Sequence, residues 1–179
     1  MALFPREEIE AAFLGFIAAA GRSGRSGDWS DWGSCMTPDA TFVETELGRF
    51  GKREAIVTAI TNAMPREGER PWGAIQGFPV EEYVIDDNRG WVWALVSARF
   101  KDPGDGSLFQ GRVFLQLKYH GEGRFYYLET IYNPYLIERA MDAWLECRAA
   151  WEEQADERMA MLAAREEQAR KMAPLKIDG

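Results

Sequence analysis

The sequence contains few of the residues that build metal sites or disulfide frameworks. Its 179 residues include one histidine, His120, and two cysteines, Cys35 and Cys147, which lie far apart and form no CxxC pair. A structural zinc site needs four Cys or His ligands, usually in closely spaced pairs, so such a site is excluded. The two cysteines are typical of buried thiols in a reducing compartment. We therefore expect neither a metal nor a cofactor.

Long apolar runs and an excess of positive charge are also missing. Residues 1–21 place acidic residues ahead of a short apolar stretch and carry no basic leader, which predicts neither a signal peptide nor a membrane span. The chain has 21 basic and 29 acidic residues, a formal net charge of −8. This charge repels a phosphate backbone. We expect a cytoplasmic protein that binds neither nucleic acid nor membranes.

Apolar and aromatic residues are abundant. Hydrophobic residues make up 46% of the chain, with 7 Trp, 6 Tyr and 10 Phe. A folded chain of this length buries roughly 68–70% of its unfolded surface, and this composition can fill such a core. The length predicts one domain, which we place at residues 1–134, with a C-terminal helical extension at 135–179.

The first part of the chain has the periodicity of helices. Apolar residues recur at helical spacing over residues 5–20, around Asp28–Met36 and over Arg53–Met64, and a short strand is predicted at Ala40–Glu44. The segment GRSGRSG at residues 21–27 predicts a flexible connector.

From Trp72 onward the apolar period changes from helical to two. Strands are predicted at residues 73–86, 90–101, 109–120 and 124–133. Their connectors are rich in Gly, Asp and Asn, which is typical of an antiparallel meander. Helices followed by such a sheet predict an α+β fold in which the sheet wraps around the helices, with an apolar pocket between them.

The C-terminal segment predicts a long helix. No proline or glycine occurs between Tyr135 and Met172, so a helix from about Pro134 to Lys171 would have roughly 37 residues and a length of about 55 Å. Its first half carries an apolar stripe and is expected to dock on the domain. Its second half is mostly charged, and we expect it to project or to pair with another subunit.

Three short runs carry a resemblance to a known family. The run Gly27-Asp-Trp-Ser-Asp-Trp32, with Thr37-Pro-Asp-Ala-Thr-Phe42 and Gly51-Lys-Arg-Glu-Ala-Ile56, resembles SnoaL-like members of the nuclear transport factor 2-like (NTF2-like) superfamily over about residues 5–134. This resemblance implies a cone-shaped, curved antiparallel or mixed sheet packed on N-terminal helices. It also implies a homodimer through the outer sheet face. The superfamily includes ketosteroid isomerases, scytalone dehydratase, limonene epoxide hydrolase, polyketide cyclases, lyases of diaryl compounds and non-catalytic binding proteins.

The same resemblance singles out one carboxylate. The stretch Gly27–Thr41 is similar without gaps to bacterial ketosteroid isomerase, which implies that Glu44 occupies the place of the catalytic base. The alternative is a solvent-facing Glu44 on an edge strand. The resemblance also puts Leu115 where the isomerase has its oxyanion-hole acid, and the first helix offers no tyrosine. Steroid isomerisation is therefore disfavoured.

The last predicted strand supplies candidate hydroxyl groups. The resemblance implies that Tyr132 is an aromatic pocket residue, and period two then places Tyr126, Leu128 and Thr130 on the same inner face. A phenolic hydroxyl can replace an acid as hydrogen-bond donor. Tyr126 and Tyr132 are therefore candidates to polarise a substrate oxygen; the alternative is that both are ordinary sheet aromatics. His120 is expected to be an exposed hairpin residue.

Together these features predict a cofactor-independent acid/base enzyme, a lyase, dehydratase, isomerase or cyclase. Its substrate would be a bulky, apolar, aromatic or polycyclic small molecule, with Glu44 transferring the proton. The alternative is a non-catalytic binding or scaffold protein of the same fold. The candidate substrate-binding residues are Trp29, Trp32, Phe16, Trp72, Phe78, Leu115, Leu117 and Thr130.

Overall fold

The computed structural model describes residues 2–64 and 71–172. The elements are α1 (Arg6–Ser26), α2 (Ser30–Ser34), β1 (Met36–Glu44), β2 (Gly48–Gly51), α3 (Arg53–Ala63), the 3-10 helix η1 (Pro71–Ala74), β3 (Ile75–Gly77), β4 (Val80–Asp86), β5 (Trp91–Phe100), β6 (Gln110–Gly121), β7 (Arg124–Ile131), α4 (Pro134–Glu153) and α5 (Ala155–Met172). Helices precede and follow one sheet, so the α+β class is confirmed.

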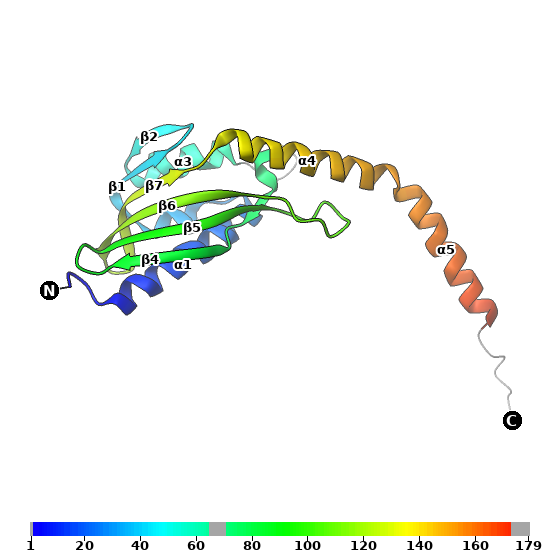
Figure 1. The fold of residues 1–179 in the computed structure, drawn as a ribbon, viewed down its shortest axis with the longest axis horizontal. Helices are drawn as coiled ribbons and strands as arrows, with labels where there is room; N and C mark the ends of the chain where they lie inside the picture. Colours follow the sequence, from blue (N-terminus) through cyan, green and yellow to red (C-terminus); the bar gives the residue numbers. More distant parts are fainter. Residues whose placement is uncertain (1, 65–70, 173–179) are drawn as a thin grey trace, which may run out of the picture.

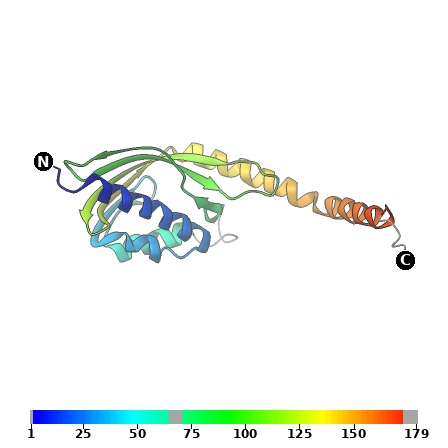
Figure 2. The ribbon, with the colours of Figure 1, turned by 90° about the horizontal axis from the view of Figure 1, so that it is seen from below.

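The sheet is mixed and strongly curved. Its strand order is β2-β1-β7-β6-β5-β3, with β4 also paired to β5. β1 runs parallel to β7, and every other described pair is antiparallel. The predicted meander is therefore present from β4 to β7, and β2 is an additional strand that was not predicted. Figure 2 shows the sheet arching over α1 and α3, which gives the cone that the resemblance implied.

Helix α1 is longer than its sequence pattern suggested. Residues 21–26 continue the helix, so the predicted flexible connector is wrong. The reason is close packing: a Cβ added to Gly24 would lie 3.0 Å from the carbonyl oxygen of Ile75, so glycine lets α1 approach β3. The helix ends where Gly27 adopts φ 73° and its N–H donates to the carbonyl of Ser23.

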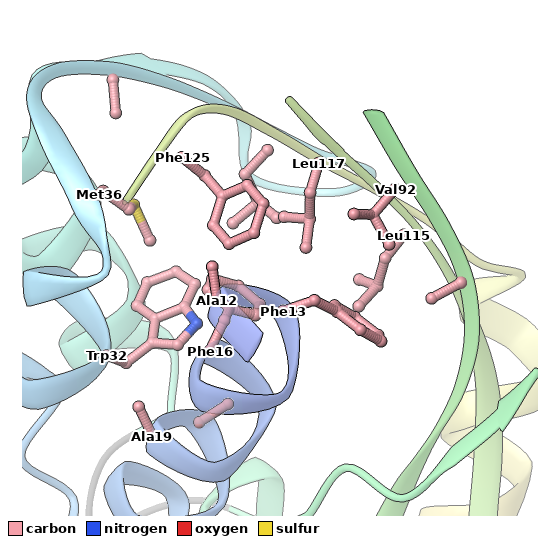
Figure 3. Packing of buried hydrophobic residues seen from close by; sticks show 14 of the residues in the cluster. Ala12, Phe13, Phe16, Ala19, Trp32, Met36, Val92, Leu115, Leu117 and Phe125 are labelled. Carbon is pink, nitrogen blue, oxygen red and sulfur yellow. The ribbon is translucent and has the colours of Figure 1, made fainter. Parts of the chain in front are cut away.

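Side chains fill one end of the cone completely. We call this the closed end and define it by Phe13 of α1, Val92 of β5, Leu117 of β6 and Phe125 of β7, each 1% exposed or less. These side chains point toward one another in Figure 3. Val92 and Leu117 are cross-strand partners, and aromatic contacts surround them. Dense packing of this kind supplies most of the hydrophobic stabilisation of a domain.

A β-bulge interrupts the alternation in β7. Phe125 pairs with Tyr119 and Tyr127 pairs with Lys118, so Tyr126 is an extra residue opposite two consecutive residues of β6. The bulge turns Phe125 into the core and leaves Tyr126 43% exposed. The expectation that Tyr126 shares the inner face with Thr130 and Tyr132 is therefore wrong, because period two does not continue through a bulge.

The C-terminal segment forms two helices instead of the predicted single one. Helix α4 packs on β6 where Gly111 makes room for Ile137, and Trp144 stacks on Phe100. The break falls at Gln154. Next to it, the Arg158 guanidinium stacks on the Trp151 ring and donates to the Trp151 carbonyl.

Helix α5 then projects away from the domain, and none of its residues is buried (Figure 1). In the described ranges, no helix has the length and apolar character needed to cross a membrane.

Candidate functional site

The other end of the cone contains a cavity of about 340 Å³. We call this end of the cone the open end. Seven of the eight predicted substrate-binding residues line it: Phe16, Trp29, Trp32, Trp72, Phe78, Leu115 and Thr130. The eighth, Leu117, is fully buried in the closed end and does not line the cavity. The boundary between the filled core and the cavity therefore falls between Leu115 and Leu117, two residues apart on one strand.

Aromatic side chains form one wall of the cavity. Trp29 and Trp32 of the α2 region contact each other at right angles, with ring centroids 5.5 Å apart. Trp32 also contacts Phe16 of α1 and Phe42 of β1. The indole N–H of Trp29 donates to the carbonyl of Met64, so its polar edge is satisfied and its apolar surface remains for a ligand.

Glu44 is the buried carboxylate of this cavity. It is the last residue of β1, lies two residues after Phe42 on the same face, and is only 8% exposed. Its Oε2 accepts hydrogen bonds from the backbone N–H groups of Glu46 (2.7 Å) and Leu47 (2.6 Å) in the turn that follows. These two bonds fix the direction of the carboxylate.

Tyr132 and Glu46 complete the polar side of the cavity. The Tyr132 hydroxyl donates to Glu46 Oε2 at 3.0 Å. Burial and the neighbouring carboxylates of Glu44 and Glu46 raise the pKa of Tyr132 far above its usual range. The hydroxyl is therefore protonated at every physiological pH. Glu46 and Leu47 are exposed and line the cavity, so its mouth lies beside the β1–β2 turn.

Parallel pairing of β1 with β7 assembles this polar group. Val43 pairs with Glu129, which brings Glu44 beside Thr130, and the Thr45 hydroxyl donates to the Thr130 carbonyl at 2.9 Å. The Thr130 hydroxyl oxygen is buried at the cavity wall and has no hydrogen-bond partner among the described residues. An unsatisfied buried hydroxyl costs free energy unless a ligand or water reaches it.

Other sequence candidates lie elsewhere. Tyr126 is outside the cavity lining, and His120 is exposed on the β6–β7 hairpin as expected. Within residues 2–64 and 71–172, no group of three or more His, Cys, Asp and Glu side chains is arranged to hold a metal ion.

Sequence reasoning left out many of the lining residues, and Glu46, Ile60 and Ile137 are the most informative of them. Glu46 lies two residues after Glu44 in the turn that follows β1, where the alternation of a strand no longer applies, so only its nearness to Glu44 along the sequence could have suggested it. Ile60 and Ile137 line the cavity from α3 and α4, and only the packing of those helices against the sheet reveals this.

Comparisons with known proteins identify the fold. No protein-family profile matches the chain, and no curated protein matches it. Similar solved structures include an LEH-like epoxide hydrolase of Mycobacterium tuberculosis, with 13% identity, 80% of this chain and 96% of that chain covered, and a TM-score of 0.58. An NTF2-like protein of Anabaena variabilis has 13% identity, 74% and 95% coverage and a TM-score of 0.53.

A third similar structure is a Catenulispora acidiphila protein with a ketosteroid isomerase-like fold, in complex with trimethylamine. It has 15% identity, 71% and 92% coverage and a TM-score of 0.53. The chain therefore has the NTF2-like fold, as the resemblance implied. At such identities the likeness concerns the fold alone, so the function has to be argued from the site.

Proposed function

We propose that the protein is a cofactor-independent enzyme that moves a proton on a bulky, largely apolar small molecule, with Glu44 as general base or acid. The observation that carries this proposal is a buried carboxylate whose direction is fixed by two backbone N–H groups, at the polar side of an otherwise apolar cavity. A positioned carboxylate in such a site suits general acid/base catalysis. Isomerisation, dehydration, cyclisation and retro-aldol cleavage all fit this chemistry.

Tyr132 has a positioning role in this proposal. Its proton points at Glu46, so in this arrangement it orients a carboxylate and does not donate to a substrate oxygen. The polarising role predicted for the Tyr132 hydroxyl would first require that bond to break. Tyr126 has no part in the proposal, because it lies outside the cavity lining.

A generic proton-abstraction probe tests the role of Glu44. Nitrobenzisoxazole fits the apolar, aromatic character of the cavity; a base removes its ring C–H proton, the N–O bond breaks, and the released nitrophenolate is followed by absorbance. Proton transfer from carbon to Glu44 leaves the total charge of the site unchanged. We expect Glu44→Gln to lower kcat/KM by about 100-fold, in line with the loss of a general base, at unchanged melting temperature.

Glu82→Gln is the matched control, because Glu82 is an exposed carboxylate on β4 outside the cavity lining. It should leave kcat/KM unchanged. A wild-type rate no higher than that of free acetate at equal carboxylate concentration would contradict the proposal, as would equal rates for wild type and Glu44→Gln. The non-catalytic binding or scaffold role would then be the better description.

A further inference from the structure

The polar groups of the cavity are strongly biased toward accepting hydrogen bonds. Glu44 and Glu46 are both acceptors, and the hydroxyl of Tyr132 uses its single proton on Glu46. Glu44 Oε2 accepts two hydrogen bonds from backbone N–H groups, and Glu44 Oε1 takes no part in these two bonds. The other polar side-chain groups in the described lining are the Thr130 hydroxyl and the indole N–H groups of the three tryptophans, of which that of Trp29 already donates to the carbonyl of Met64. A ligand that donates hydrogen bonds suits this site better than one that accepts them.

The charged groups in the described lining of the cavity are all negative, which also favours a cationic ligand. Two carboxylates line the cavity, and no lysine, arginine or histidine is among its described lining residues. In the described part of the chain, no ion pair within 4 Å involves Glu44 or Glu46, although several other carboxylates form such pairs. A buried carboxylate without a counter-charge is costly, and a cationic ligand would supply one.

The aromatic wall favours the same kind of ligand. Phe42 lies on the face of β1 that carries Glu44, and it contacts Trp32, which contacts Trp29. Aromatic faces attract cations within about 6 Å of the ring centroid, and this attraction grows when the cation is desolvated. The carboxylates and these aromatic side chains line the same cavity, and both kinds of group attract a cation.

We propose that the occupant of this cavity is an organic cation, an apolar or aromatic amine whose protonated nitrogen lies between Glu44 and Glu46. An ammonium group offers several N–H donors and a positive charge, so it matches both the hydrogen-bond bias and the charge bias. The apolar part of the amine fills the space along Phe16, Leu115 and Trp72. This inference rests on the proposed use of the cavity as a small-molecule site, and it does not depend on proton transfer.

Three isosteric probes test the proposal: naphthylmethylamine, naphthylmethanol and naphthoate, which share one ring system and carry a cationic, a neutral and an anionic head. Their Kd values are measured at neutral pH by titration calorimetry on the full chain. We expect the amine to bind at least roughly tenfold more tightly than the alcohol, a difference of about 1.4 kcal/mol. The carboxylate should bind most weakly.

Three variants test whether the preference for the amine over the alcohol arises in the cavity. Glu44→Gln should remove most of the amine-over-alcohol ratio and leave alcohol binding nearly unchanged, and Glu46→Gln should reduce the ratio in part because Glu46 is exposed. Glu82→Gln removes the same charge outside the cavity lining and should leave the ratio as in the wild type. Tm measurements confirm that each variant is folded.

The outcomes separate this proposal from the catalytic one. Alcohol binding as tight as amine binding, or an amine preference that survives Glu44→Gln, would overturn it. If the preference for the amine depends on Glu44 but the protein has no nitrobenzisoxazole activity, the result would support the ligand class and refute the proposed enzymatic function. Failure of all three probes to bind would overturn the ligand class, whereas a Glu44-dependent nitrobenzisoxazole rate would still support the enzyme.

Discussion

The closed end and the open end of the cone are built from the same strands and the same helix, yet only one of them is filled. On β6, Leu117 is fully buried in the closed end and Leu115 lines the cavity. On α1, Phe13 packs into the closed end and Phe16 lines the open end.

What differs is the residues that the neighbouring strands contribute. The bulge in β7 adds Phe125 to the closed end, whereas β1 ends at the open end with a carboxylate.

This contrast shows how the fold makes a site without weakening the core. The closed end supplies a densely packed anchor for the sheet, so the open end can retain a cavity and a buried carboxylate, both of which cost free energy. Helix α4 also contributes Ile137 to the cavity lining at the open end.

The largest expected difference between the two ends comes from one pair of substitutions. Leu117→Trp should lower the free energy of unfolding by about 1–3 kcal/mol, because extra volume in a filled core forces strain. Leu115→Trp should cost less than this, since its ring can enter the cavity, and it should weaken naphthylmethanol binding. Urea denaturation and calorimetry measure both effects. Equal destabilisation by the two variants would mean that the ends are equally packed.

A second pair of substitutions compares a tyrosine hydroxyl inside the open end with one outside it. Tyr132→Phe deletes the bond to Glu46 and should reduce the free energy of unfolding by about 1 kcal/mol, a typical net value for a hydrogen bond. It should also change kcat/KM for nitrobenzisoxazole by up to roughly tenfold. Tyr126→Phe should change neither quantity, because Tyr126 is outside the cavity lining. A larger kinetic effect at Tyr126 would show that the bulge does not turn it away from the site.

The smallest effect is expected beyond both ends, in the C-terminal arm. Deleting residues 155–179 should leave the melting temperature and naphthylmethanol binding unchanged, because no residue of α5 is buried and the cavity lining ends at Ile137. Reduced binding by the truncated chain would show that the open end depends on the arm.

The mass of the truncated chain in solution tests how copies associate. We propose a homodimer through the outer sheet face, where Phe114 and Ile131 are 40% and 52% exposed. Such a dimer should survive the deletion, whereas a dimer that becomes monomeric on deletion would assign pairing to α5.

Local pattern predicted the elements that depend on local chemistry. Helical spacing of Ile9, Phe13 and Phe16 identified α1, and alternation identified the long strands. The place of Glu44 at the cavity was implied by the family resemblance, and the structure puts it on the same face of β1 as Phe42. The pattern failed where packing overrode propensity, as at Gly24, which lies in a helix because it fits against β3.

By itself, then, the sequence determined the α+β class, the main helices and long strands, and seven of the residues that line the cavity, since these follow from the periodicity of side chains along one segment. Tertiary structure alone decided which end of the cone is filled, that Tyr132 meets Glu46 and that Tyr126 faces outward. The physical reason is that pairing register and bulges are set between strands distant in sequence, and a single inserted residue reverses the face of the residues on either side of it.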